Sequence, residues 1–596
     1  MELTRTRPAD TLVGIVIYGG QMSSALTPQS RAAALQSMAS EELDVLVIGG
    51  GVTGAGIAVD AVTRGLRTGV VEMQDWAGGT SSTSSKLVHG GLRYLYNLDF
   101  ALVAEGLRER ALLLTTTAPH LVKAQPFLWP LKRRVIERAY SALGVGMYDA
   151  MAVAGHRGKA VPTQKHYSKR GALRLFPDIR PGALVGGIRF YDARVDDARL
   201  VTTLIRTAQN YGAHAASRTQ VVDLLKDGER VVGARVVDLE SGEQVQVRAK
   251  HVINATGVWT EETQALATEQ AKVQVLMSKG VHIVVPAERI NGRTGIFLRT
   301  EKSVLFIIPW QRYWIIGTTD TPWTQGPLRP VATRADVDYL LEHANSVLRS
   351  ELTFDDIIGV YAGLRPLVRP GKDATSTKIS RDHTVLRAAP AMTVIAGGKL
   401  TSYRAMAEDA VDAALGTYRA KAIPSVTART PLVGAAGLDA VTAQASRIGA
   451  EHGWSSERVQ HLLGRYGTEL TQIAAAVAED PGLGEPLQAA PAYLRAEVAW
   501  AVTHEGALHL EDILQRRVRL FHESRDRGLA ALEEIAGIAA PLLGWDAPAT
   551  AEEIASYRTL AQAEEDALAT LADDDAAAAR SQAPERVPLH PVGGQN

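Results

Sequence analysis

A glycine-rich turn near residue 50 constrains the fold more than any other feature of the sequence. The apolar run Val45–Ile48 leads directly into Gly49-Gly-Gly51-Val-Thr-Gly54, which has the spacing G-x-G-x-x-G, and apolar residues then recur at helical spacing. A strand, a tight turn and a helix in this order bring backbone N–H groups against a pyrophosphate. The segment Thr68–Glu72 predicts a second strand, ending in an acid placed to accept hydrogen bonds from ribose hydroxyls. The sequence therefore predicts a dinucleotide site and leaves open which dinucleotide binds.

Residues 217–257 favour FAD. Three alternating segments that begin at Gln220, Arg230 and Gln244 are joined by glycine-containing turns, as in a hairpin meander. Late in the chain, Met392–Thr401 repeats the order of strand, glycine pair and helix. A meander within a nucleotide fold is typical of flavoproteins, and a late helix N-terminus can stabilise the negative charge of a reduced flavin.

Composition narrows the possible functions. A chain of 596 residues with 46% hydrophobic content can bury a large core in two or more domains. The 64 basic and 65 acidic residues give a net charge of −1, which offers no argument for a nucleic-acid partner. Cysteine is absent, which excludes disulfides and thiolate chemistry, so redox chemistry requires a cofactor. We expect no metal site, no secretory signal and an intracellular, cytoplasmic protein.

An ordered set of motifs resembles the FAD-dependent glycerol-3-phosphate dehydrogenases over roughly residues 42 to 540. The motifs are the turn Gly49–Gly54, Ser84–Leu95, Tyr191-Asp with Val195–Leu200, Asn254–Gly257, Lys279–Pro286, Ile308–Trp310 with Gly317–Asp320, Gly363–Leu367, Ser380–Asp382 and Gly397–Arg404. The resemblance implies that FAD takes a hydride from C2 of sn-glycerol 3-phosphate, yielding dihydroxyacetone phosphate, and that a quinone accepts the electrons.

This resemblance and the residue patterns together predict an α/β (α+β) fold. It has a Rossmann-like, two-dinucleotide FAD-binding domain with a β-meander, a β-rich substrate or cap domain and a C-terminal α-helical domain. The expected ranges are a flexible extension at 1–40, an FAD-binding domain at 41–125, 196–260 and 355–424, a substrate domain at 126–195 and 261–354, a helical domain at 425–555, and an acidic helix with a disordered tail at 556–596.

By resemblance, the loop from Ser82 to Lys86 wraps the ribityl and pyrophosphate region of FAD, and His89 with the next glycines lies against the flavin ring. The complete set of predicted cofactor-binding residues is Gly49, Gly51, Gly54, Glu72, Ser82, Ser84, Ser85, Lys86, His89, Gly90, Val222, Gly257, Gly398, Lys399, Leu400 and Thr401.

The substrate carries a phosphate and a secondary alcohol, so the site needs guanidinium groups and a base. Arg365 and Arg381 are predicted mainly for the phosphate, and Arg93 and Tyr94 are expected to face the substrate. Two residues, His282 and His89, are candidates for the base, and the choice between them stays open. A further residue, Lys399, is expected to stabilise either the reduced flavin or the substrate oxyanion.

The segment Phe127–Arg138 combines apolar residues with cations, and residues 150–177 contain only basic residues among their charged side chains before Asp178. We interpret this region as a peripheral contact with an anionic membrane surface, with Phe127 and Trp129 at the interface, which suits a lipid-soluble quinone. A solvated loop beside the core is the alternative.

Two other functions stay open. One is a flavin oxidase that uses oxygen, acting on glycerol 3-phosphate or on an amine. The other is a non-catalytic FAD-binding module, which the predicted site residues argue against. A homodimer is also left open.

Overall fold

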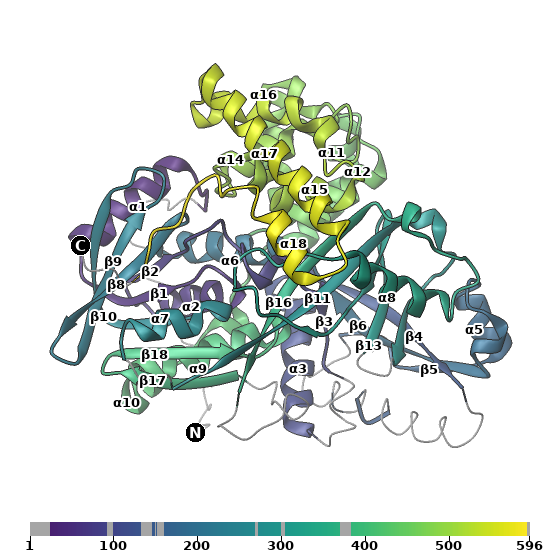
Figure 1. The fold of residues 1–596 in the computed structure, drawn as a ribbon, viewed down its shortest axis with the longest axis horizontal. Helices are drawn as coiled ribbons and strands as arrows, with labels where there is room; N and C mark the ends of the chain where they lie inside the picture. The colour runs from purple at the N-terminus through teal and green to yellow at the C-terminus, as the bar shows by residue number, and fades with distance from the viewer. Residues whose placement is uncertain are drawn as a thin grey trace, which may run out of the picture.

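A computed structural model describes residues 24–91, 99–132, 146–148, 151, 160–268, 272–299, 304–369 and 383–592. Two sheets and a helical layer make up this part of the chain (Figure 1). The predicted α/β (α+β) class is confirmed, with a strand–turn–helix sheet that includes a β-meander, a second β-rich part and a helical C-terminal domain.

The first sheet is the nucleotide-binding sheet. Its strands run in the order β17-β18-β10-β1-β2-β7, with the β8–β9 hairpin continuing from β10. The strands are β1 (Leu43–Ile48), β2 (Thr68–Val71), β7 (His214–Ala216), β8 (Thr219–Asp227), β9 (Arg230–Asp238), β10 (Gln244–Asn254), β17 (His383–Ala389) and β18 (Met392–Gly397). Because β2, β1, β10 and β18 are parallel, their carboxyl ends meet at one edge, where the glycine turns lie.

Helices cover both faces of this sheet. The helices α2 (Val52–Thr63), α6 (Asp197–Asn210) and α9 (Tyr403–Leu415) pack through an Ala- and Val-rich core. The other face is covered by α1 (Pro28–Ser40) and the β8–β9 hairpin. The prediction of a flexible extension over 1–40 is therefore wrong for residues 28–40. The helix α1 buries Leu35 and Met38, and Arg31 binds Asp238.

The second sheet carries two of the predicted substrate residues, His282 and Arg365. Its strands run in the order β15-β11-β14-β13-β12-β4-β6-β3, with β16 on β11 and β5 on β6. They are β3 (Leu87–Val88), β4 (Lys123–Leu131), β5 (Lys165–Ser168), β6 (Gly186–Arg194), β11 (Val275–Pro286), β12 (Gly295–Arg299), β13 (Val304–Trp310), β14 (Tyr313–Gly317), β15 (Thr321–Pro322) and β16 (Gly359–Val368). Residues 359–368 thus pair within this sheet, although we expected them in the FAD-binding domain.

The helices α3 (Phe100–Leu112), α5 (Lys169–Leu175) and α8 (Arg334–Asn345) pack against the second sheet. The short helices α7 (Thr260–Ala265) and α10 (Thr417–Ala422) pack on the side of the first sheet, against β10 and β18 and against α9. The helix α8 packs its Val337, Leu340 and Leu341 on strand β11 and its neighbours.

The aromatic anchors expected at a membrane are inside the second sheet. The side chain of Phe127 is 1% exposed and stacks on Phe190, and Trp129 is 6% exposed and contacts Phe297. Our placement of Phe127 and Trp129 at a membrane interface is therefore wrong. The strand β4 packs between β6 and β12, so its apolar side chains fill the core. In the described part of the chain, no helix combines the length and the apolar character needed to cross a membrane.

The C-terminal helices form a separate layer above both sheets (Figure 1). They are α11 (Leu438–Glu451), α12 (Ser456–Tyr466), α13 (Leu470–Glu479), α14 (Arg495–Thr503), α15 (Leu520–Glu523), α16 (Leu532–Leu543), α17 (Ala547–Leu568) and α18 (Asp573–Arg580). The acidic stretch Glu564–Asp575 is broken between α17 and α18 instead of forming one helix. The expected disordered tail is also corrected, because residues 581–592 follow a defined path.

Candidate active site

The predicted glycine turn forms one wall of a cavity at the carboxyl edge of the first sheet. Gly49 has a φ of +111°, and Gly51 is the N-cap of α2 without a side-chain cap. A Cβ on Gly54 would lie 1.8 Å from the carbonyl oxygen of Gly49. Glycine is therefore required here by backbone contact. The N-terminus of α2 faces the cavity, where Val52 N donates to Ser81 Oγ at 3.0 Å.

The acid predicted at the end of β2 is fixed by the same turn. The backbone N–H of Gly50 donates to Glu72 Oε2 at 2.6 Å, and the N–H of Gln74 donates to Oε1 at 2.7 Å. Burial raises the pKa of Glu72 above its usual value. Each carboxylate oxygen keeps a second acceptor position, which suits a ribose hydroxyl.

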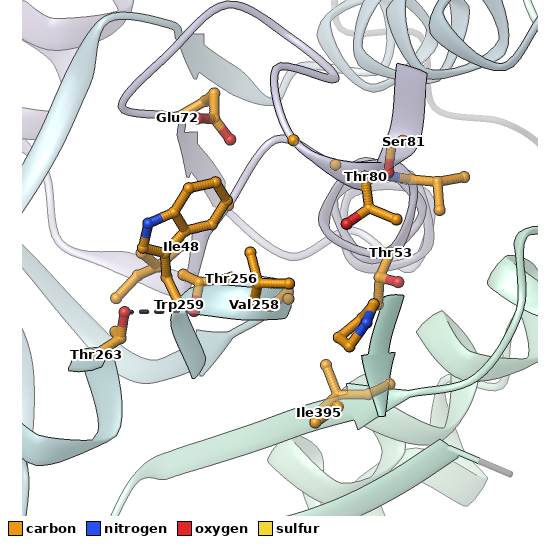
Figure 2. Close-up of a pocket in the computed structure, with 18 of the residues that line it drawn as sticks. Ile48, Thr53, Glu72, Thr80, Ser81, Thr256, Val258, Trp259, Thr263 and Ile395 are labelled. Atoms are coloured by element: carbon orange, nitrogen blue, oxygen red, sulfur yellow. Dashed lines mark hydrogen bonds between the residues drawn. The ribbon is translucent and has the colours of Figure 1, made fainter. Parts of the chain in front are cut away.

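The cavity extends across several elements and has a volume of about 1290 Å³, which includes open solvent at its mouth. In Figure 2, Thr53, Thr80 and Ser81 lie on one side of the view, with Trp259 and Thr263 on the other. Gly257, which we predicted, lines this cavity, as do Thr219, Gln220 and Val221 of β8, next to the predicted Val222. The β8–β9 register shifts between Val221 and Asp223, so Val222 lies in a bulge of this hairpin.

A second cavity begins where the first ends. Both are lined by Thr80, Pro366 and the segment from Gly397 to Leu400, which includes the predicted Gly398, Lys399 and Leu400. The second cavity also brings together the predicted residues Ser84, Ser85, His89, His282, Arg365 and Thr401. Residues separated by more than 300 positions in the sequence thus meet at one place.

His282 lies on β11 in the wall of this second cavity. Its Nε2 is 2.8 Å from Ser85 Oγ, and its ring stacks on Tyr361. Its Nδ1 is buried and has no hydrogen-bond partner in the described part of the chain. Burial, with Arg365 and Lys86 nearby, lowers the pKa of His282 well below its usual value, so the imidazole is neutral at physiological pH.

Arg365 lies on β16 beside this histidine. Its Nη2 donates to Thr318 Oγ1 and to the carbonyl oxygen of Thr319, both at 2.9 Å, and its Nη1 lies 3.2 Å from Asp320 Oδ1. The side chain remains 24% exposed. The guanidinium is therefore held in place by the loop after β14 while it still faces the cavity.

Thr401 positions His89. The backbone N–H of His89 donates to Thr401 Oγ1 at 3.0 Å, and that hydroxyl donates to the carbonyl oxygen of His89 at 3.1 Å. These two hydrogen bonds connect the loop that contains His89 to the segment after Gly397 and Gly398.

A buried cluster behind Gly90 was missed by the sequence analysis. The hydroxyl of Tyr148 donates to Asp192 Oδ1 at 2.5 Å, Arg110 Nη1 lies at the same distance from that oxygen, and Gly90 N donates to Tyr148 at 2.8 Å. Burial raises the pKa of Asp192, which also lines the second cavity. Asp192 belongs to a motif we identified, but no local pattern connects it to Arg110 or Tyr148.

Three predicted cofactor residues use their side-chain polar groups in contacts within the protein. Lys86 Nζ is buried 2.5 Å from Asp197 Oδ1, and Ser84 Oγ donates to Asp197 Oδ2 at 2.7 Å. Burial lowers the pKa of Lys86 to about 8. Ser82 Oγ lies 3.4 Å from the carbonyl oxygen of Gly79. The side chains of Lys86 and Ser84 thus stabilise the loop through Asp197. The predicted residues Arg93, Tyr94 and Arg381 lie outside the described residues.

The residues of the first cavity fit FAD. The glycine cradle excludes any side chain, the α2 N-terminus faces the cavity, and Glu72 stands at the end of β2. A pyrophosphate, a ribose and an extended ring system each have a matching wall.

Comparisons with known proteins agree with this geometry. Residues 44–404 match the family model of FAD dependent oxidoreductases, and residues 425–550 match the C-terminal domain of alpha-glycerophosphate oxidase. The glycerol-3-phosphate dehydrogenase of Mycobacterium leprae is 51% identical over 94% of this chain and 95% of its own length. The mitochondrial glycerol-3-phosphate dehydrogenase of Homo sapiens is 36% identical over 89% of this chain and 75% of its own.

Among solved structures, the glycerol-3-phosphate dehydrogenase from Bacillus halodurans complexed with FAD superposes with a TM-score of 0.73 at 29% identity. It covers 90% of this chain and 98% of its own. The predicted cofactor and family are both confirmed. The chain belongs to the FAD-dependent glycerol-3-phosphate dehydrogenases, within the FAD-dependent oxidoreductase family.

Proposed function

We propose that this chain oxidises sn-glycerol 3-phosphate to dihydroxyacetone phosphate in the second cavity and delivers the electrons to a quinone. The observation that carries the proposal is the pairing of a buried neutral His282 with Arg365 beside the wall shared with the FAD cavity. The names of the relatives in Mycobacterium leprae and Homo sapiens support the same substrate.

Different residues act on the alcohol and on the phosphate of the substrate. When bound, FAD would supply the acceptor for the hydride from C2 of the substrate. His282 accepts the proton of the C2 hydroxyl, because its imidazole is neutral and Ser85 Oγ fixes the ring. Of the two predicted candidates, we assign the base to His282, since the backbone of His89 is held by Thr401 and the substrate wall of β11 presents His282.

Arg365 binds the substrate phosphate. A guanidinium held at Thr318 and Thr319 is already oriented, so little conformational freedom is lost when a phosphate arrives. Lys399, on the shared wall, adds a positive charge near either the reduced flavin or the substrate oxyanion. Arg93, Tyr94 and Arg381 remain proposed substrate residues on the basis of their motifs.

The protein is also proposed to contact the anionic face of a membrane peripherally, from the cytoplasmic side. Of the basic residues predicted for this contact, Lys165 on β5 and Lys169, Arg170 and Arg174 on α5 are exposed. This helix lies at the edge of the molecule, away from the C-terminal helical layer (Figure 1). Exposed cations are attracted to anionic lipid, from which a quinone is accessible.

Anaerobic mixing tests the proposal. Adding sn-glycerol 3-phosphate to the FAD-loaded protein should bleach the flavin absorbance, while glycerol should bleach it far more slowly. A water-soluble quinone should then restore the colour faster than dissolved oxygen. Rapid recovery with oxygen and formation of hydrogen peroxide would identify an oxidase instead, and failure to bleach would reject the substrate.

A further inference from the structure

The end of the chain returns to the FAD cavity. In Figure 1 the yellow segment after α18 passes from the helical layer to the side of β8 and β9. Residues 581–592 carry it there without regular secondary structure. Composition alone predicted disorder for this segment, so its fixed path needs a cause.

Ion pairs anchor the segment at successive points. Asp573, at the start of α18, binds Lys279 of β11, and Arg580 Nε lies 3.0 Å from Glu564 Oε1. Glu585 then binds Arg329, and Arg586 Nε lies 2.7 Å from Glu553 Oε1. The last of these ion pairs connects the tail to α17, where the Glu553 side chain is only 3% exposed. The chain is therefore held up to Arg586 before it reaches the first sheet.

Beyond that anchor, the tail pairs with β8 through one side chain. The amide of Gln220 donates through Nε2 to the carbonyl oxygen of His590 at 3.0 Å, and His590 N donates to Gln220 Oε1 at 2.8 Å. The side-chain N–H and the side-chain oxygen of Gln220 thus both bind the backbone of His590. Pro588 and Pro591 flank this contact and restrict the chain around His590, which lowers the entropy lost on ordering.

This pairing places Val592 at the FAD cavity. Val592 lines the cavity together with Glu72, Thr219, Gln220 and Val221. Its side chain is nevertheless 43% exposed. An apolar side chain held at the mouth of a largely apolar cavity is available to be covered by a bound ligand.

We propose that residues 587–592 form part of the FAD-binding site, closing the end of the cavity that contains Glu72. The tail retains FAD there, because release requires the Gln220–His590 pair to open. The relevant group is the adenosine portion of FAD, since Glu72 is the acid predicted for its ribose.

Two chain lengths test this inference. A chain that ends at Arg586 keeps every ion pair described above, and a chain that ends at Val592 serves as the matched control. FAD release from the loaded protein is followed by separation on a desalting column and by the fluorescence of free flavin. We expect release roughly 10-fold faster from the shorter chain, as for the loss of two hydrogen bonds and an apolar contact, with unchanged melting of the FAD-free proteins.

A second variant separates the effect of the Gln220–His590 contact from a direct effect of Gln220 on FAD binding. Gln220→Ala should accelerate FAD release in the chain ending at Val592 and add little in the chain ending at Arg586, because its partner is already absent. Equal release rates from the two chain lengths would overturn the proposal. So would equal effects of Gln220→Ala in both, or faster release matched by weaker folding of the FAD-free protein.

Discussion

The two cavities that meet at Gly397–Leu400 are built by different means. The FAD cavity depends on backbone: Gly49 and Gly54 leave no room for side chains, and the N-terminus of α2 faces the cavity. The second cavity depends on side chains that are oriented by hydrogen bonds. Ser85 binds His282, and the loop after β14 binds Arg365.

This difference predicts which property of the protein is lost when a residue of each cavity is mutated. Loss of a glycine in the first changes where the backbone runs, so binding of FAD should be lost as a whole. Loss of a side chain in the second should leave FAD in place and change one property of the reaction. The predictions below run from the largest expected effect to the smallest.

Gly54→Val should abolish FAD binding. The new Cβ would lie 1.8 Å from the carbonyl oxygen of Gly49, so the strand and helix must separate. The ratio of flavin to protein absorbance after purification measures this. Gly464→Ala on α12 is the control, because a Cβ there meets nothing within 4 Å. A Gly54→Val protein with a full complement of FAD would show that this contact does not shape the cavity.

His282→Ala should retain FAD while flavin reduction by substrate slows by roughly 10²-fold or more, as for loss of a general base. Stopped-flow absorbance under anaerobic conditions measures the rate. His452→Ala, in the helical domain, is a control that should react like the parent. An unchanged rate would remove His282 from the proposed role.

The pH dependence of the same step follows from the burial of His282. Its pKa in the folded protein is lowered below the usual 6.5, so the neutral base is present at neutral and alkaline pH. Reduction should therefore be independent of this group from pH 6.5 upward and slow only as pH falls through the lowered pKa. The favourable contribution of the neutral ring to stability is likewise present above pH 6.5 and lost in acid. A rate that rises with pH through 6.5 to 7.5 would contradict this assignment, if His282→Ala removes the rise.

Arg365→Lys should lower kcat/KM for glycerol 3-phosphate roughly 10- to 150-fold, because a charge-assisted bond to phosphate contributes about 1.5 to 3 kcal/mol. Turnover of glycerol should change little. Arg447→Lys on the exposed face of α11 is the control for a general effect of the exchange. Equal losses with both substrates would assign Arg365 to the fold of the loop around Asp320.

Thr401→Val should have the smallest effect. It removes two hydrogen bonds to the backbone of His89 but changes no other side chain of the cavity. We expect flavin reduction to slow by about 5-fold, as for a net loss near 1 kcal/mol, with FAD retained. Steady-state and single-turnover rates measured together distinguish this from slower product release. A loss as large as that of His282→Ala would mean that the position of His89 controls the chemistry.

The sequence predicts the first cavity better than the second because the first is local. Gly49, Gly54 and Glu72 lie within one strand–turn–helix–strand unit, and their spacing in the sequence is enough to predict a dinucleotide site. The contact of His282 with Ser85 joins strand β11 to a loop 197 residues earlier in the chain, and the sequence analysis did not predict it. The cluster of Arg110, Tyr148 and Asp192 has no local pattern at all.

Two errors show where composition misleads. Apolar residues beside cations suggested a membrane surface, yet Phe127 and Trp129 lie on a strand with neighbours on both sides, while the cations Lys165, Lys169, Arg170 and Arg174 are exposed. A Pro-rich polar ending suggested disorder, yet long-range partners such as Gln220 and Glu553 hold it. In both cases the deciding contacts are remote in sequence.

The central claim is that C2 of glycerol 3-phosphate reacts in the second cavity while FAD occupies the first. It is tested most directly by single-turnover flavin reduction with substrate carrying hydrogen or deuterium at C2. The account predicts complete bleaching in both cases, several-fold slower with deuterium, and a further slowing of both in His282→Ala without loss of FAD. Bleaching at the same rate with either isotope in His282→Ala, where the chemical step is slowest, would contradict it.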